Sequence, residues 1–231
     1  MAGSPRKGVA AVPSSRSILD REFAEIRDNL LRIGYLVDAA IERAMQSLNA
    51  HDAGLARQVI DDDAAINELR FAIEEACLRL IATQQPAAGD LRTAMAAVSI
   101  ATDIERMADH ATGIAKTVLR MGADAPPRPL VDLNPMAQTA RRMFQAALDA
   151  YVARDAEAAR RVAAEDDEVD HMYKALFDEL IQKMARDPSV VAHCTYLLWC
   201  GHNLERIGDR VTNIAERIIF MLTGTLKELN V

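Results

Sequence analysis

Residues 203–216 read NLERIGDRVTNIAE, and residues 103–115 read DIERMADHATGIA. The two stretches lie 100 residues apart and share Glu, Arg, Asp, Thr, Ile and Ala at six matching positions. Apolar residues in both recur at steps of three and four, which is the period of one face of an α-helix. A repeat of this kind predicts that the chain is built from two similar helical units.

The rest of the chain has the same helical period, interrupted by prolines and polar turns. Asp52 is expected to cap the second helix, and the segment 61–67 aligns with 165–171 at an offset of 104 residues. The predicted fold class is therefore all-α: a tandem repeat of two antiparallel three-helix bundles with six long helices. The expected helices cover about residues 19–48, 52–80, 97–118, 136–153, 156–185 and 189–222.

Proline and charge patterns divide the 231-residue chain into segments. Residues 1–17 lack the apolar run of ~7–15 residues of a signal peptide, and we predict a disordered leader there. Residues 18–122 form the first predicted bundle, and residues 135–222 form the second. A proline-rich linker is expected over 123–134 and a C-terminal tail over 223–231.

Charge and composition narrow the classes of partner. The net charge is −7 and basic residues do not gather on one face, so nucleic acid is not an expected partner. No apolar run approaches the ~18 residues of a membrane span, so any membrane contact is expected through partners alone. Three cysteines in an acidic chain indicate reduced thiols, and we predict a cytoplasmic protein.

An acidic face is predicted on the last helix. Glu205, Asp209 and Asn213 follow each other at intervals of four residues. On a helix, each of these side chains is therefore rotated by about 40° around the axis from the one before. Carboxylates at this spacing repel each other by a few tenths of a kcal/mol, and a hard cation would remove the repulsion. The face therefore predicts a site for divalent or trivalent metal ions, such as iron, manganese, magnesium or zinc.

A stripe of small residues beside this face predicts close packing by the preceding helix, over 156–185. The stripe consists of Gly201, Gly208, Thr212 and Ala215. A helix packed against it would bring Asp166, Asp167 and Asp170 towards the acidic face, and of these we predict Asp167 and Asp170 as ligands. The predicted metal ligands of the second half therefore come from two helices.

The first half repeats this arrangement in a weaker form. Glu105 and Asp109 occupy the matching positions, and Asp63 lies on the preceding helix. Gly113 and Lys116 stand where the second half has Asn213 and Glu216, and the lysine could neutralise the acids without a metal. If only one half binds metal, we expect it to be the second.

Two other interpretations remain open. An acidic helix face is commonly plain solvated surface, so the chain could be a metal-free structural bundle. Glu168 and His171 form one E-x-x-H pair, which suggests a ferritin-like carboxylate metalloprotein, although such sites use two pairs.

Trp199 is predicted to lie in the core. The sequence has no glycine-rich phosphate loop and no G-x-S-x-G, so no catalytic residues are predicted.

The chain resembles the PhoU family of phosphate-signalling regulators over residues 18–222. The resemblance rests on DREFAEIRDNLLRIGYLVDAAIERA (20–44), QQPAAGDLR (84–92) and the two paired motifs quoted above. The family's acidic motif maps onto Glu105 and Asp109, and again onto Glu205 and Asp209. Asp63 and Asp167 match its acidic positions on the preceding helices.

This resemblance implies tandem three-helix bundles, usually as a homodimer, with multinuclear metal clusters in some members. It implies a regulator that is not an enzyme and that represses phosphate-starvation signalling. The implied partners are the ATPase subunit of the phosphate ABC transporter and a sensor histidine kinase. No organic cofactor is implied.

Overall fold

The computed structural model describes residues 15–122 and 130–225, and all regular structure there is helical. The all-α prediction is confirmed. A short 3-10 helix, η1, spans Pro188–Val190 before the last helix. The α-helices are α1 (Ser15–Ala50), α2 (Ala53–Gln84), α3 (Ala88–Met121), α4 (Asn134–Ala153), α5 (Ala156–Ala163), α6 (Asp166–Arg186) and α7 (Val191–Thr223).

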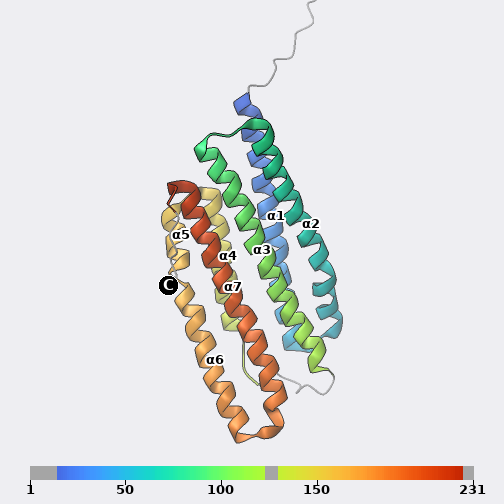
Figure 1. The fold of residues 1–231 in the computed structure, drawn as a ribbon. Coiled ribbons are helices and arrows are strands. Elements are labelled where there is room, and N and C mark those ends of the chain that lie inside the picture. The colour runs from blue at the N-terminus through green and yellow to red at the C-terminus, as the bar shows by residue number, and fades with distance from the viewer. Residues whose placement is uncertain (1–14, 123–129, 226–231) are drawn as a thin grey trace, which may run out of the picture.

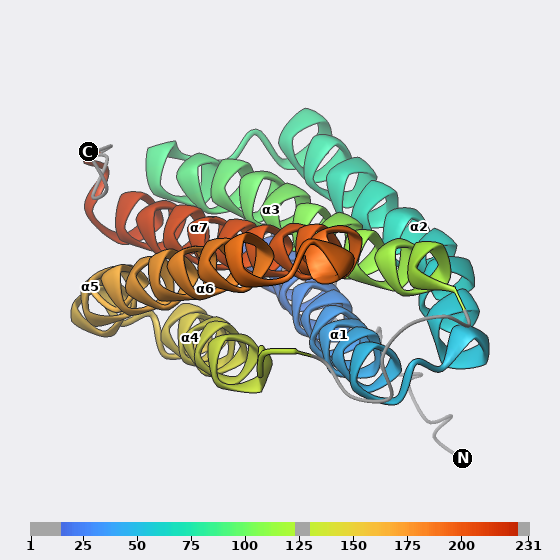
Figure 2. The same ribbon diagram turned by 90° about the horizontal axis from the view of Figure 1, so that it is seen from below.

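The helices form two three-membered bundles that lie side by side. One bundle contains α1, α2 and α3, and the other contains α4, α7 and the collinear pair α5 and α6 (Figure 1). α3 and α7 run antiparallel through the middle of the molecule, with α2 on one flank and α5–α6 on the other (Figures 1 and 2). None of the helices in the described part of the chain is both long and apolar enough to cross a membrane.

The central helices repeat each other as predicted. Ile104 and Ile114 of α3 are fully buried, and so are Leu204 and Ile214, 100 residues later in α7. Each helix carries a broad apolar stripe at steps of three and four, because α3 and α7 are covered by their own bundle and by each other. The predicted cap of α2 also forms, since the Asp52 carboxylate accepts the amides of Gly54 and Leu55.

The predicted alignment of the second helices is wrong by one residue. The buried residues Ile66 and Ile73 of α2 correspond to Val169 and Leu176 of α6, an offset of 103 rather than 104. The same offset relates α4 to α1, where Ile41 corresponds to Phe144. The counterpart of Asp63 is therefore the buried Asp166, and that of Asn67 is Asp170.

The single helix predicted over 156–185 is broken in two. The α-helical hydrogen-bond pattern changes at Glu165, whose N–H donates to the carbonyl of Val162 (3.1 Å), and α6 begins at Asp166 with three acids in its first turn. Acids favour a helix N-terminus, where backbone N–H groups lack partners. Arg142 of α4 holds this start through Glu165 (2.7 Å) and Glu168 (3.1 Å).

The other predictions on the chain's segments and on Trp199 need correction or fall outside the described residues. α1 begins at Ser15, so residues 15–17 are helical and not part of a leader. The predicted leader 1–14, the linker segment 123–129 and the tail segment 226–231 lie outside the described residues. Trp199 is 46% exposed and does not lie in the core.

Polar contacts cross between the two bundles at related positions. Asp103 of α3 meets Arg210 (3.4 Å) and Asn213 (3.4 Å) of α7. In the opposite direction, the Asn203 Oδ1 atom of α7 lies 3.1 Å from His110 Nδ1 of α3. The two contacts are related by an approximate two-fold axis, as expected for antiparallel copies of one helix.

Candidate functional site

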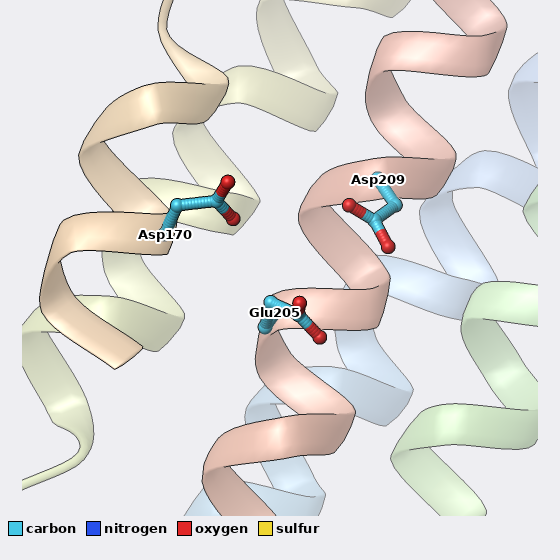
Figure 3. A group of neighbouring side chains, drawn as sticks. All are labelled: Asp170, Glu205 and Asp209. Atoms are coloured by element: carbon cyan, nitrogen blue, oxygen red, sulfur yellow. The ribbon is translucent and has the colours of Figure 1, made fainter. Parts of the chain in front are cut away.

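Three carboxylates converge between α6 and α7. Asp170 of α6 points towards Glu205 and Asp209 of α7 (Figure 3). One oxygen from each residue lies within 4.8 Å of the other two. Asp170 is exposed, whereas the side chains of Glu205 and Asp209 are only 22% and 28% exposed. We refer to Asp170, Glu205 and Asp209 as the acidic cluster.

The stripe of small residues on α7 lets α6 come this close. A Cβ atom placed on Gly201 would overlap with Cδ2 of Leu176. A Cβ atom on Gly208 would lie 3.0 Å from the carboxylate of Asp166 and 3.3 Å from Val169. The stripe prediction therefore identified the packing surface that places Asp170 opposite the acids of α7.

The acidic cluster holds its negative charge at an energetic cost. Burial raises the pKa of Glu205, and the neighbouring Asp209 raises it further. Burial also raises the pKa of Asp209, with Asp170 adding to the effect and Arg206 opposing it. Arg206 lies 2.6 Å from Asp209, and His202 Nδ1 lies 3.1 Å from Glu205. Local positive groups therefore compensate only part of the repulsion.

The geometry suits a hard cation. Such ions bind carboxylate oxygens at about 2.0–2.6 Å, so two oxygens on one ion are separated by at most about 5 Å. The three oxygens of the acidic cluster already satisfy this limit. Asp170, Glu205 and Asp209 could therefore hold a divalent or trivalent ion together with water, and this ion would neutralise the repulsion.

The corresponding acids of the first half are arranged differently. Burial raises the pKa of Asp63 and Asp109 raises it further, whereas Lys116 lowers it. Asn67, the counterpart of Asp170, donates a hydrogen bond of 2.9 Å to Asp63. The pKa of Glu105 is raised by burial and then by Asp109. Among the described residues, only the second half brings three acids within 4.8 Å of each other.

Two predicted ligands lie apart from the acidic cluster. Asn213 faces α3, where its side-chain amide donates to Asp103 (3.4 Å). Asp167 is exposed on α6, and the buried Asp166 beside it faces Gly208. The offset of 103 instead of 104 explains why Asp167 points away from the acidic cluster, since neighbouring residues of a helix point about 100° apart.

The sequence prediction missed Tyr173 as a neighbour of the acidic cluster. Burial raises the pKa of its phenol, and Glu205 adds to the shift. Its ring centroid lies 6.0 Å from that of His202. Its place one helical turn after Asp170 would have been the only signal, because i and i+3 share a helix face.

Comparison with known proteins agrees with this architecture. The PhoU domain matches residues 30–118 and again residues 133–218, one match in each half. A protein of Clostridium acetobutylicum is 37% identical over 217 residues, covering 94% of this chain and 99% of its own. A Pseudomonas aeruginosa protein is 36% identical over 205 residues, covering 88% and 85%. Both are named phosphate-specific transport system accessory protein PhoU homolog.

Solved structures are similar along the whole fold. PhoU from Pseudomonas aeruginosa superposes with a TM-score of 0.85 at 36% identity, covering 90% of this chain and all of the other. The phosphate transport system regulatory protein PhoU from Streptococcus pneumoniae gives 0.84 at 33% identity, covering 91% and 100%. Both halves of this chain match the family domain and both superpositions span nearly its full length, so the chain belongs to the PhoU family.

Proposed function

We propose that this protein is a non-catalytic, cytoplasmic regulator of phosphate uptake and of phosphate-starvation signalling. The observation that carries the proposal is the pair of PhoU-domain matches, one in each half. It is supported by relatives that align over 94% and 88% of the chain and are named accessory proteins of a phosphate-specific transport system. We infer that this chain represses starvation genes when phosphate is plentiful.

The fold suits an adaptor that acts through contact. Long helices packed as rigid bundles present extended faces, and helical faces are a common surface for docking. The proposed partners are the ATPase subunit of the phosphate ABC transporter and a sensor histidine kinase. In this proposal the protein works as a homodimer and reaches the membrane only through these partners.

The acidic cluster has a structural role in this proposal. A divalent or trivalent ion held by Asp170, Glu205 and Asp209 would join α6 to α7 and fix their relative position. The raised pKa values of Glu205 and Asp209 support such a role, because uncompensated carboxylates destabilise the packed helices.

A reporter for a phosphate-starvation gene tests the regulatory role. Deletion of this gene should raise reporter output in high phosphate, and the parent chain should restore repression. The Asp170→Asn/Glu205→Gln variant should restore it less completely, whereas Asp178→Asn/Glu179→Gln, which changes two exposed acids of α6, should match the parent. Unchanged reporter output after deletion would overturn the proposed role.

The ferritin-like alternative finds less support in the site. Glu168 is half-exposed and pairs with Arg142 (3.1 Å), and His171 is exposed on α6. Di-iron bundles instead direct such ligands into the bundle interior. Oxidation of added ferrous iron by the purified protein, at a rate above buffer alone, would favour this alternative.

A further inference from the structure

A cavity separate from the acidic cluster lies where α1 begins and α7 ends. Its volume is about 420 Å³, within the range of about 300–1,000 Å³ typical of small-molecule sites. Its walls come from the first turns of α1 and α3 and from the last turns of α4 and α7. The starts of α1 and α3 and the end of α7 lie at the same end of the molecule (Figure 1).

The α1 wall of this cavity is not part of the repeat. α4 begins at Asn134, which corresponds to Leu31 of α1 at the offset of 103. Residues 15–30 of α1 therefore have no helical counterpart in the described part of the second half. They extend α1 beyond the repeated bundle and close one side of the cavity against the ends of α4 and α7.

The cavity is positive in a chain whose net charge is −7. Four arginines and two aspartates line it, which leaves a local charge of about +2. Arg16 contacts both aspartates, Asp20 at 3.0 Å and Asp90 at 2.8 Å. The remaining three arginines are Arg27, Arg92 and Arg154. Arg16 thus forms ion pairs with both aspartates of the cavity.

Arg92 and Arg154 have no acidic partner among residues 15–122 and 130–225. Within the described residues, neither side chain forms an ion pair or a hydrogen bond, and the Nε atom of Arg92 is buried without an acceptor. Each guanidinium offers five N–H donors in a planar fork that matches a phosphate group. The C-terminal ends of α4 and α7 also lie at this end and attract these cations, but no described carbonyl accepts a hydrogen bond from either guanidinium.

Most of the remaining lining residues are apolar, apart from Thr93 and the Tyr151 hydroxyl. Phe23, Val152, Met221 and Leu222 contribute to the walls, and Tyr151 is buried beside them. Burial raises the pKa of Tyr151 to about 12, so its hydroxyl stays neutral. Unpaired arginines next to an apolar wall favour a ligand that has both an anionic and an apolar part.

We propose that this cavity binds a small organic phosphate of nucleotide size, with its phosphates on Arg92 and Arg154 and its apolar part against Phe23 and Met221. Bare phosphate would fill only part of the volume and would leave the apolar wall uncovered. Binding would join the extended end of α1 to α4 and α7, and therefore connect the two bundles.

Isothermal titration calorimetry of the full chain with ADP tests this proposal. The parent should bind ADP, and Arg92→Gln/Arg154→Gln should bind it at least tenfold more weakly. The charge-matched control Arg57→Gln/Arg79→Gln, which changes two exposed arginines of α2 outside the cavity, should bind as the parent does. Added salt should weaken binding to the parent, because screening reduces the attraction between arginine and phosphate.

Inorganic pyrophosphate separates the two parts of the proposed ligand. It carries the phosphates without the apolar part, so it should bind more weakly than ADP. Absence of ADP binding, equal binding by parent and Arg92→Gln/Arg154→Gln, or equal binding of ADP and pyrophosphate would each overturn the proposal. Melting curves without ligand show whether the variants are folded, and Arg154→Gln alone, at an exposed turn, gives a second test if Arg92→Gln unfolds the chain.

Ligand binding in this cavity is independent of the proposed regulatory function. The calorimetry uses neither the transporter nor the kinase, whereas the reporter experiment does not require a ligand. Failure of one therefore leaves the other standing.

Discussion

Replacing Asp170 by Asn removes one charge from the acidic cluster while keeping the side-chain shape. The two oxygens left on Glu205 and Asp209 each lose a negative neighbour within 4.8 Å. At this distance two unit charges repel by about 0.9 kcal/mol at the dielectric constant of water and about 3.5 kcal/mol at a dielectric constant of about 20. Asp170 is exposed, so the smaller figure applies.

Positive neighbours reduce this gain. Arg206 contacts Asp209, and His202 contacts Glu205, so part of the repulsion is already compensated. We therefore expect Asp170→Asn to stabilise the metal-free protein by about 1 kcal/mol. For a chain of this size, that corresponds to a rise in melting temperature of about 2–4 °C.

Metal should reverse the order of stability. A ligand at a hundred times its Kd stabilises a folded protein by about 2.7 kcal/mol, and the parent should gain this from Mn²⁺ through three carboxylates. Asp170→Asn keeps only two and should gain less. The variant should thus melt above the parent in EDTA and below it in Mn²⁺.

Differential scanning calorimetry measures both conditions on the same samples. Asp178→Asn, an exposed acid further along α6, is the matched control and should follow the parent in each. A variant that melts below the parent in EDTA would refute the repulsion argument. Equal stabilisation of parent and variant by Mn²⁺ would refute a metal site at the acidic cluster.

Three further outcomes are expected. Arg141→Met should destabilise the protein by about 1–3 kcal/mol in urea unfolding, because it removes hydrogen bonds of 2.7 and 2.8 Å that join α4 to a half-buried Asp38 on α1; a change below 0.5 kcal/mol would contradict this. Ile207→Ala should cost about 2–5 kcal/mol in the same assay, since Ile207 is fully buried. Burial lowers the pKa of His110, so below about pH 6.5 the unfolded chain takes up a proton that the folded chain resists, and stability falls as pH falls. His110→Gln should flatten this decline between pH 7 and 5.5, and identical slopes would argue against it.

Most of the fold follows from periodicity alone. The stripes of α3 and α7 are long and continuous, so their helical form and their 100-residue offset are visible in the sequence. The break between α5 and α6 is not visible in the sequence, because Ala164 and the acids after it are compatible with a continuous helix. At this break, Arg142 of α4 contacts Glu165 and Glu168 at the start of α6, which is a tertiary contact that the local sequence does not reveal.

The candidate site was predictable only in part. Glu205 and Asp209 are one helical turn apart, and a single helix is enough to place them together. The position of Asp170 opposite these acids depends on the register between α6 and α7. The close contacts of α6 with Gly201 and Gly208 of α7 set this register. Asn213 lies about 80° around the helix from Glu205, and that rotation carries it towards α3 and Asp103 instead.

The antiparallel seam between α3 and α7 joins different side chains at its two related positions. In the intact chain, Asp103 faces Arg210 and Asn203 faces His110, so an anion meets a cation and a neutral amide meets an imidazole. Two copies of the first half, paired by the same geometry, would set Asp103 against His110. Two copies of the second would set Arg210 against the uncharged Asn203. The duplicated surface has thus become asymmetric, and only the pairing of a first half with a second half sets the Asp103 carboxylate against the Arg210 guanidinium.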